Sequence, residues 1–393
     1  TGPYSIETGV VINNIGIDRS VPNMGQWFEE HSDYARVYCG KWHAGGPWNN
    51  PHVSGARKIP GFDTIPNGPD SWGRHMDYGV STGIEAYVRN HKSKNPFLAV
   101  AGFMDPHDIC FWAGHLDHGR TRNEDFFELG NELPVAPPNV DYDFDEIWGG
   151  RTGHSTMQWR NYRYDYCRMV ERLDRNVGRL LRAVRDRGDD TILIFTSDHG
   201  DGVGRHSRVQ KWHPYDESVK VPFIVYGPKF GIRRNVVDTT HLVSGVDIMT
   251  TVCDYAGIPT PPHSRGLTLR PLLEGKQTEW RKSVFIELQQ VGRVIRSDRY
   301  KYVMSYEPVP KRMKHSINEN YLTRDGKPTM FLPGSREAMQ RVEQTMLFDM
   351  QNDPWETRNL VDDPALRDVI AAHEAMLHDH EAVLIPGREF TRG

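Results

Sequence analysis

Four short apolar runs, each followed at once by polar residues, constrain the fold of this 393-residue chain more than any other feature. They are YARVYCGKWH at 34–43, PFLAVAGFMDPH at 96–107, TILIFTSDHG at 191–200 and VPFIVYGP at 221–228. Unbroken apolar runs of this length are typical of strands buried on both faces of a largely parallel sheet. We therefore expect four buried strands whose polar turns lie at the edge of the sheet.

Helices are predicted between these strands. Apolar residues recur at three- and four-residue spacing at Tyr166, Met169, Val170, Leu173, Val177, Leu180, Leu181 and Val184. This spacing predicts an amphipathic helix that ends near Gly188. A second helix is expected to begin at the cap Asp247 and to stop at Gly257, before Pro259. Alternating strands and helices indicate an α/β sandwich, in which ligands bind at the carboxyl ends of strands.

The texture of the sequence changes after the Pro-rich link IPTPPHSRG at 258–266. Shorter segments follow, namely SVFIEL, GRVIRSDRYKYVMSY and MLFDM, and then a terminal helix. We predict a catalytic α/β domain over 1–275. A smaller domain, an antiparallel sheet with a covering helix, is predicted over 276–393.

The turn SDHG at the end of the third run carries two possible metal ligands, Asp198 and His199. A carboxylate and an imidazole at the rim of a sheet can bind a cation together. The alternative is that Asp198 only caps a helix, as an Asp at a strand end often does.

Two further strand ends carry basic side chains. In GKWHAGG, Lys41 and His43 share a face in extended geometry, so both can reach one anion while Trp42 packs behind them. Alternatively, they are a surface lysine and a half-buried histidine. In MDPHD, Pro106 fixes the backbone before His107, which is either a catalytic group or a structural histidine.

The segment RHSRVQKWHPYDESVKVP places Lys211 where it can reach back over the same rim. We expect Lys220 to be a solvated charge, and His206 and His213 to be rim residues without an assigned role. Two lysines, two histidines and the Asp-His pair on successive strand ends describe a pocket for a multiply charged oxyanion beside a cation.

Several classes of protein are excluded. The net charge is −4 and the basic residues are scattered, so no nucleic-acid surface is expected. No apolar run approaches the ~20 residues needed to cross a bilayer. The cysteines are far apart, which favours free buried thiols over a disulfide framework or zinc site. They are Cys39, Cys110, Cys167 and Cys253.

With these motifs the chain resembles the formylglycine-dependent (type I) sulfatases of the alkaline phosphatase superfamily. The segments that match, in order, are TGPYSIETGV, GKWHAGG, SDHGDGVGRH, KWHPYDESVKVP, VDIMTTVCDYAGIP and LFDMQNDPWETRNL. The resemblance spans nearly the whole chain and an ordered set of this kind is highly specific. It implies an alkaline-phosphatase-like sandwich, with a large mostly parallel sheet between helices and a smaller C-terminal antiparallel sheet.

The resemblance also implies roles for individual residues. Asp198 and His199 would coordinate a metal, Ca²⁺ by resemblance, and Lys41, His43, His107 and Lys211 would bind sulfate. In the family, the histidine that matches His43 helps to break down a sulfated hemiacetal, and the residues that match His107 and Lys211 assist the leaving oxygen. A periplasmic or secreted location is implied, although no signal peptide is visible in this sequence.

The chain departs from the family pattern in two respects. The paired aspartates and the Cys/Ser-x-Pro-x-Arg motif that supplies formylglycine are absent. We expect them upstream of Thr1, so this sequence by itself should be inactive. Second, many relatives have Asn where His199 stands, and Ca²⁺ prefers oxygen ligands. Another divalent ion, or a His199 that touches sulfate, is therefore open.

A sulfated polysaccharide or oligosaccharide is the expected substrate. Specificity is expected in the rim segments 44–75, 108–160 and 305–345, which are rich in Arg, Trp, Tyr and His. A phosphonate or phosphodiester hydrolase of the same superfamily and a non-catalytic glycan-binding relative are the alternatives. The acidic residues Asp349, Asp353 and Glu356 are expected only to form turns and caps. The sequence does not indicate an oligomeric state.

Overall fold

The computed structural model describes residues 1–8, 10, 17, 21–42, 59–66, 73–111, 133–141, 153–211, 213–288, 292–306 and 342–384. Its first sheet is parallel, in the order β2-β1-β3. The strands are β1 (Ala35–Gly40), β2 (Asp63–Thr64) and β3 (Phe97–Gly102). Gly40 pairs with Gly102, so the carboxyl ends of β1 and β3 lie side by side. The first two apolar runs therefore form parallel strands that deliver their polar turns to one edge, as predicted.

The other two runs are also strands, but they form a separate pair in the described part of the chain. They are β4 (Leu193–Thr196) and β5 (Phe223–Tyr226), which run antiparallel. Among the described residues of the connection between them, the only α-helix is the short α6 (Asp216–Val219), and no long crossover helix of the kind that joins parallel strands is found there. Most residues of β3, β4 and β5 are half-buried rather than fully buried, in contrast to the prediction.

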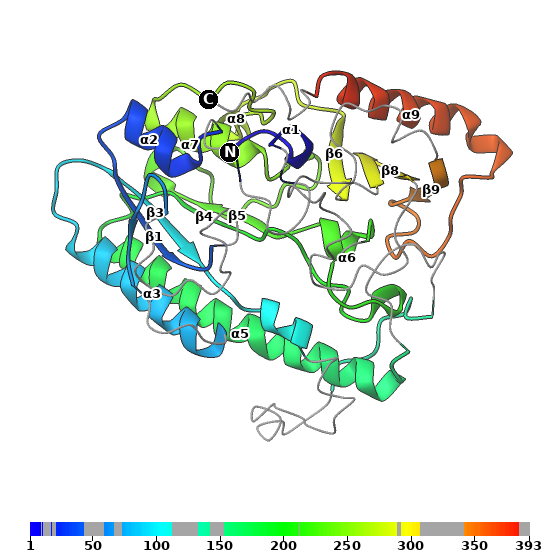
Figure 1. Ribbon diagram of the computed structural model, residues 1–393, viewed down its shortest axis with the longest axis horizontal. Coiled ribbons are helices and arrows are strands. Elements are labelled where there is room, and N and C mark those ends of the chain that lie inside the picture. Colours follow the sequence, from blue (N-terminus) through cyan, green and yellow to red (C-terminus); the bar gives the residue numbers. More distant parts are fainter. Residues whose placement is uncertain are drawn as a thin grey trace, which may run out of the picture.

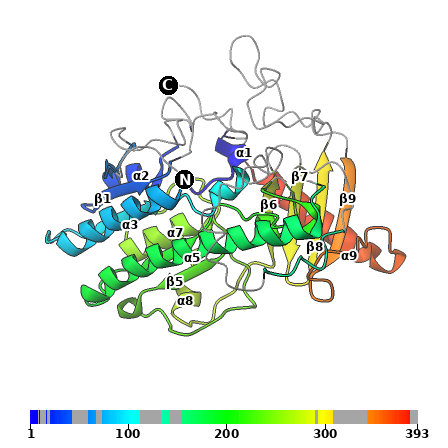
Figure 2. The same ribbon diagram turned by 90° about the horizontal axis from the view of Figure 1, so that it is seen from below.

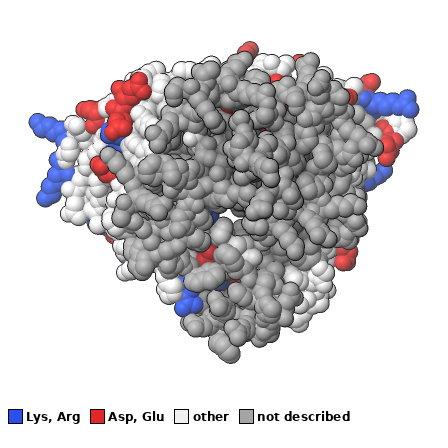
Figure 3. All heavy atoms as spheres, in the orientation of Figure 1, with Lys and Arg blue, Asp and Glu red and all other residues white. Residues whose placement is uncertain are grey.

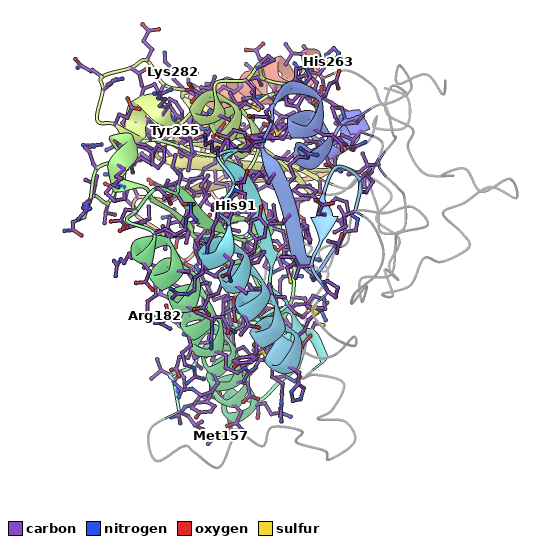
Figure 4. All side chains as sticks on the ribbon, turned by 90° about the vertical axis from the view of Figure 1, so that its left-hand side faces the viewer. His91, Met157, Arg182, Tyr255, His263 and Lys282 are labelled. Carbon is purple, nitrogen blue, oxygen red and sulfur yellow. The ribbon has the colours of Figure 1, made fainter. Side chains whose placement is uncertain are left out.

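Helices cover both faces of the parallel sheet (Figure 1). On one face, α3 (Gly73–Asn90) and α5 (Thr156–Asp186) lie side by side, also in the view of Figure 2. Figure 4 shows that His91, just after α3, and Met157, at the start of α5, lie towards opposite ends of this helical layer. On the other face, α2 (Met24–His31) and α7 (Asp247–Ala256) share a core. The result is an α/β sandwich.

Both predicted helices are present. The helix α5 ends before Gly188, as expected, but it begins earlier than the apolar spacing showed, because Ser155 and Gln158 form a capping box. The helix α7 stops at Gly257, whose φ of 69° is left-handed. Asp247 is its first residue rather than its cap, and its carboxylate pairs with Arg281 instead.

A separate antiparallel sheet follows in the order β6-β7-β8-β9. Its strands are β6 (Ser283–Leu288), β7 (Gly292–Ser297), β8 (Tyr300–Tyr306) and β9 (Val342–Asp349). The helix α9 (Arg367–Ala382) packs against one face, and Tyr215 packs against the other. The short elements are α1 (Ser5–Thr8), η1 (His107–Phe111), η3 (Arg205–Ser207), η4 (Pro228–Phe230), α8 (Arg270–Leu273) and η7 (Pro364–Leu366). The domain boundary at 275/276 remains a prediction.

Three acidic residues near this sheet have different roles. Asp349 accepts hydrogen bonds from the turn amides of Gln351 and Asn352, as expected, and also forms an ion pair with Arg299. Asp353 caps Thr357 and Arg358, as expected. Glu356 differs, because its side chain is fully buried in an ion pair with Lys301. Glu356 also lies in a turn, since its amide donates to the carbonyl of Asp353, but the ion pair with Lys301 was not predicted.

All four cysteines are free. Cys39 and Cys253 are buried, as predicted, whereas Cys167 is exposed on the outer side of α5 and Cys110 is half-buried. No described helix is both long and apolar enough to span a membrane. Lys and Arg side chains of the described residues lie at separate places around the face seen in Figure 3, with Asp and Glu among them.

Candidate anion and metal site

Lys41 leaves the sheet directly after β1. Its amide donates a hydrogen bond to the carbonyl of Gly102 at 2.8 Å, and its carbonyl accepts one from the hydroxyl of Tyr38. A Cβ on Gly102 would lie 2.6 Å from the Lys41 carbonyl, so only glycine permits this approach. The backbone of Lys41 is therefore fixed at the carboxyl edge of the parallel sheet. His43 lies outside the described residues.

The turn after β4 brings Asp198 and His199 together with Lys211. Nδ1 of His199 lies 2.7 Å from the carbonyl of Gly200, which can only accept, so Nδ1 carries the proton. Nε2 then offers a lone pair, and the ammonium of Lys211 donates to it at 2.7 Å. The Asp198 carboxylate is 3.5 Å from the same Nε2 and is 75% exposed. The turn thus places the Asp198 carboxylate, whose Oδ1 accepts a hydrogen bond from the His199 amide at 3.0 Å, beside the imidazole.

The charge of Lys41 also acts on these three residues. Desolvation by the surrounding protein favours the neutral form of Asp198, but its neighbours His199, Lys211 and Lys41 outweigh this effect and lower the pKa of the carboxyl. Burial lowers the pKa of His199, and both lysines add to that effect against the opposing charge of Asp198. The pKa of Lys211 is lowered by burial and by Lys41, although Asp198 opposes the shift. Two lysine charges therefore act on one Asp-His turn.

Lys211 follows a loop that is tied to the core. The buried carboxylate of Asp201 accepts hydrogen bonds from the amides of Val203 and Gln210 and from the hydroxyl of Tyr162. Burial raises the pKa of Asp201 to about 6, although these hydrogen bonds oppose the shift. The side chain of Gln210 donates to the carbonyl of Cys110, which lies in η1. The lysine segment and η1 are therefore attached to each other.

His107 begins η1 and is half-buried, with Nδ1 at 3.4 Å from the carboxylate of Asp108. Burial is the main cause that raises the pKa of the Cys110 thiol to about 12, and the charges of Lys41 and Lys211 oppose it. Because the charges of both Lys41 and Lys211 act on Cys110, the short helix η1 lies close to these two lysines.

Asp77 on α3 supports the turn before His107 and was not predicted. Its carboxylate accepts hydrogen bonds from the amides of Met104 at 2.7 Å and Asp105 at 2.9 Å. Asp105 in turn pairs with Arg172 of α5. Asp77 follows Met76 on the buried face of α3, so a carboxylate on an apolar helix face was the available signal.

Three other predictions concern the segment around Lys211. Lys220 is exposed, as expected. His206 and His213 are fully buried rather than at the rim, so that expectation is wrong. The ring of His206 stacks on Tyr215 at 3.7 Å, and burial lowers the pKa of His213 to about 3. Tyr215, which follows His213, packs on the antiparallel sheet, and both histidines are buried beside it.

The residues fit a divalent cation in part. A carboxylate oxygen of Asp198 and the imidazole Nε2 of His199 are groups that bind such an ion, although Nε2 accepts a hydrogen bond from Lys211 in this structure. The described residues contain no group of three or more His, Cys, Asp or Glu that could hold a metal, whereas Ca²⁺ takes six to eight ligands. Asp198 and His199 are therefore a partial set, and the Lys211 ammonium lies beside them.

The fold and site define a class, namely the α/β sandwich enzymes of the alkaline phosphatase superfamily that act on oxyanion esters. The sulfatase family model matches residues 1–258, and an N-sulphoglucosamine sulphohydrolase C-terminal model matches residues 204–315. The chain therefore belongs to the sulfatase family.

Individual relatives agree with this assignment. A Delta 4,5-hexuronate-2-O-sulfatase of Bacteroides thetaiotaomicron is 29% identical over 402 residues, covering 93% of this chain and 73% of the relative. The structure of a 2-O GAG sulfatase superposes with a TM-score of 0.72 at 25% identity, covering 97% of this chain and 79% of that one. A phosphonate monoester hydrolase of Agrobacterium radiobacter shares the fold, with a TM-score of 0.70 at 19% identity over 98% and 85% of the two chains. These findings support a sulfuric ester hydrolase that acts on carbohydrate.

Proposed function

We propose that this chain carries the sulfate-binding site of a sulfuric ester hydrolase that removes sulfate from a sulfated polysaccharide or oligosaccharide. The observation that carries the proposal is the contact of the Lys211 ammonium with His199, beside Asp198 and under the charge of Lys41. The two lysine ammonium groups beside this carboxylate can bind the negatively charged oxygens of a sulfate ester.

Each residue has a task in this proposal. Lys41 and Lys211 bind sulfuryl oxygens, and both stabilise charge as the ester bond breaks. His107 holds a proton at the leaving alcohol oxygen, while Asp108 orients its ring. His43 acts as the base that regenerates the resting site. Asp198 and His199 hold a divalent cation, Ca²⁺ in the first instance, which would polarise the sulfuryl group when bound.

The nucleophile belongs to the proposal as well. A hydrated formylglycine would supply it, from the Cys/Ser-x-Pro-x-Arg segment that the family resemblance places before residue 1. Residues 1–393 contain no such motif, so we propose that they hydrolyse no sulfate ester by themselves. A periplasmic or secreted enzyme would meet extracellular polysaccharides directly.

Relatives support the substrate class. One relative is named for a hexuronate 2-O-sulfate, another for N-acetylglucosamine-6-O-sulfate, and one related structure holds D-glucosamine-2-N,6-O-disulfate. Sulfated oligosaccharides that contain uronate or hexosamine are therefore the first substrates to test. The segments expected to select among them, 44–75, 108–160 and 305–345, lie largely outside the described residues.

Substitution tests the site in a protein that joins this chain to its nucleophile segment. Lys211→Ala and His107→Ala should each lower the rate of sulfate release by on the order of 10²-fold, because a charge or a proton donor is lost at the reacting group. Lys220→Ala is the matched control, since Lys220 lies in the same segment and is exposed. Near-normal turnover in both site variants would refute their roles.

A phosphonate or phosphodiester hydrolase is the second candidate. The phosphonate monoester hydrolase with the same fold favours it, because two lysines beside a cation suit phosphoryl oxygens equally well. A non-catalytic glycan-binding protein would instead bind sulfated glycans without releasing sulfate after the nucleophile segment is restored.

A further inference from the structure

A buried ion pair lies outside the anion site, on the antiparallel sheet. Lys301 on β8 and Glu356 after β9 are both fully buried, with Nζ 2.6 Å from Oε1. The same ammonium lies 2.5 Å from Oδ1 of Asp216, the first residue of α6. The positive charge of Lys301 is thus shared between the sheet and the segment that follows Lys211. Removing one partner of a buried pair leaves an uncompensated charge, so the contact is energetically demanding.

The second carboxylate oxygen of Glu356 holds the backbone of α6. Oε2 accepts a hydrogen bond from the Asp216 amide at 2.7 Å, and Lys301 donates to the carbonyl of Pro214 at 3.2 Å. Lys211 reaches His199 from the turn just before these two residues. The ion pair therefore fixes the end of the lysine turn from the side of the antiparallel sheet.

The other end of α6 holds the Asp-His turn. The carbonyl of Ser218 accepts a hydrogen bond from the amide of Gly200 at 2.8 Å. The carbonyl of Gly200 in turn accepts a hydrogen bond from Nδ1 of His199. A Cβ on Gly200 would lie 1.9 Å from the Glu217 carbonyl, so the approach is close. One short helix therefore connects Glu356 to both Lys211 and His199.

A histidine closes the same connection. Nδ1 of His206 lies 2.8 Å from the Glu217 carboxylate, and Nε2 lies 3.1 Å from the carbonyl of Glu356. The ring stacks on Tyr215, which is buried against the antiparallel sheet. His206 therefore links Glu217 of α6 directly to the backbone of Glu356.

We propose that Glu356, charge-paired with Lys301, is a positioning residue that sets the relative geometry of Lys211 and His199 through α6. The inference rests on the proposed function, since it concerns the same sulfate site. It assigns the antiparallel sheet a role in sulfate binding, although Glu356 and Lys301 do not touch the ligand. Two features are needed, namely a hydrogen-bond acceptor for the Asp216 amide and a balanced charge between positions 301 and 356.

Four variants of the full chain separate the acceptor from the charge. Glu356→Gln and Lys301→Met each leave an unbalanced buried group, and each should weaken the binding of inorganic sulfate by ~10-fold, as is typical for groups that orient a ligand-binding residue. The double variant Lys301→Met/Glu356→Gln keeps one carbonyl acceptor for the Asp216 amide. Its sulfate affinity should return to within about threefold of wild type. Lys301→Met/Glu356→Leu has no acceptor and should stay ~10-fold weaker.

Titration calorimetry with sodium sulfate measures these affinities, and hydrogen exchange of the Gly200 and Asp216 amides reports the connection itself. The control is Asp349→Asn, which breaks the pair between Asp349 and Arg299 in the same region and should lower stability without weakening sulfate binding. If the single variants do not fold, the two double variants still provide the comparison, because both lose the Lys301 contact with Asp216 in the same way and differ only in the side chain at position 356.

Equal sulfate affinity in the Gln and Leu double variants would overturn the positioning role of Glu356 while leaving the sulfate site intact. The proposed site, and the inference with it, would be overturned if the wild-type chain did not bind sulfate. The same would follow if Lys211→Ala bound sulfate as well as wild type.

Discussion

The contact between Lys211 and His199 sets the protonation of the site. The Nδ1 proton is held by Gly200, so the lone pair of Nε2 faces the lysine. Burial and the lysine charges together keep the pKa of His199 below its usual range. The imidazole is therefore neutral near pH 7, and its Nε2 lone pair can accept a hydrogen bond from the Lys211 ammonium or bind a metal cation.

Lys211→Met should raise the pKa of His199, since it removes both a positive charge and a donor to Nε2. An NMR titration of the metal-free chain, with the His199 resonance assigned through His199→Asn, measures the shift. Lys220→Met should leave this pKa unchanged. A pKa of His199 that does not move in Lys211→Met would contradict the contact.

The predicted site residues all come from motifs that end a strand or follow one. Lys41, Asp198, His199 and Lys211 were found from short apolar runs followed by charged turns, and the structure brings them together. Glu356 was misjudged because its partner Lys301 lies far away in the sequence, and no local pattern connects them. Buried ion pairs between distant elements depend on the tertiary fold.

At the scale of elements, the close packing of α6 on the turn after β4 gives a sharp prediction. Gly200→Ala should destabilise the chain by about 1–3 kcal/mol, because the new methyl group overlaps the Glu217 carbonyl. Gly178→Ala is the matched control, since its Cβ meets nothing closer than 3.6 Å in the interior of α5. That change should be neutral or stabilise by about 0.5–1 kcal/mol. Urea denaturation measures both, and equal effects would refute the contact.

The support of the His107 turn by α3 predicts a pH dependence. Burial raises the pKa of Asp77 to about 7, the Met104 and Asp105 amides oppose the shift, and the Asp105 and Asp108 charges add to it. Arg172 also faces this group through Asp105. Between about pH 4 and pH 7 the folded state holds a proton that the unfolded state has released. Wild-type stability should therefore fall with rising pH in this window.

The variant Asp77→Asn isolates this effect, since Asn does not titrate. The stability advantage of wild type over the variant should be larger at pH 5 than at pH 8, by about 2–3 kcal/mol at most. Denaturation curves at the two pH values give the comparison. An advantage that stays constant or grows with pH would contradict the raised pKa.

Across the whole molecule, the fold class was predictable and the arrangement of its sheets was only partly so. Alternating apolar runs and amphipathic spacing identified the strands, the helices α5 and α7 and the antiparallel sheet. The pairing of β4 with β5 was not predictable, because strand direction depends on the course of the intervening chain. The burial of His206 and His213 was not predictable either, because it depends on the packing of Tyr215 against a sheet that lies much later in the sequence.

Sulfate ester hydrolysis is tested most directly by comparing two ester classes. The chain joined to its nucleophile segment is given sulfated uronate-containing oligosaccharides and a phosphonate monoester, and kcat/KM is measured for wild type and Lys211→Ala. Sulfate release should exceed phosphonate hydrolysis by ~10²-fold or more, and Lys211→Ala should abolish most of it. Faster hydrolysis of the phosphonate ester, or sulfate release that does not depend on Lys211, would contradict a sulfatase built on this site.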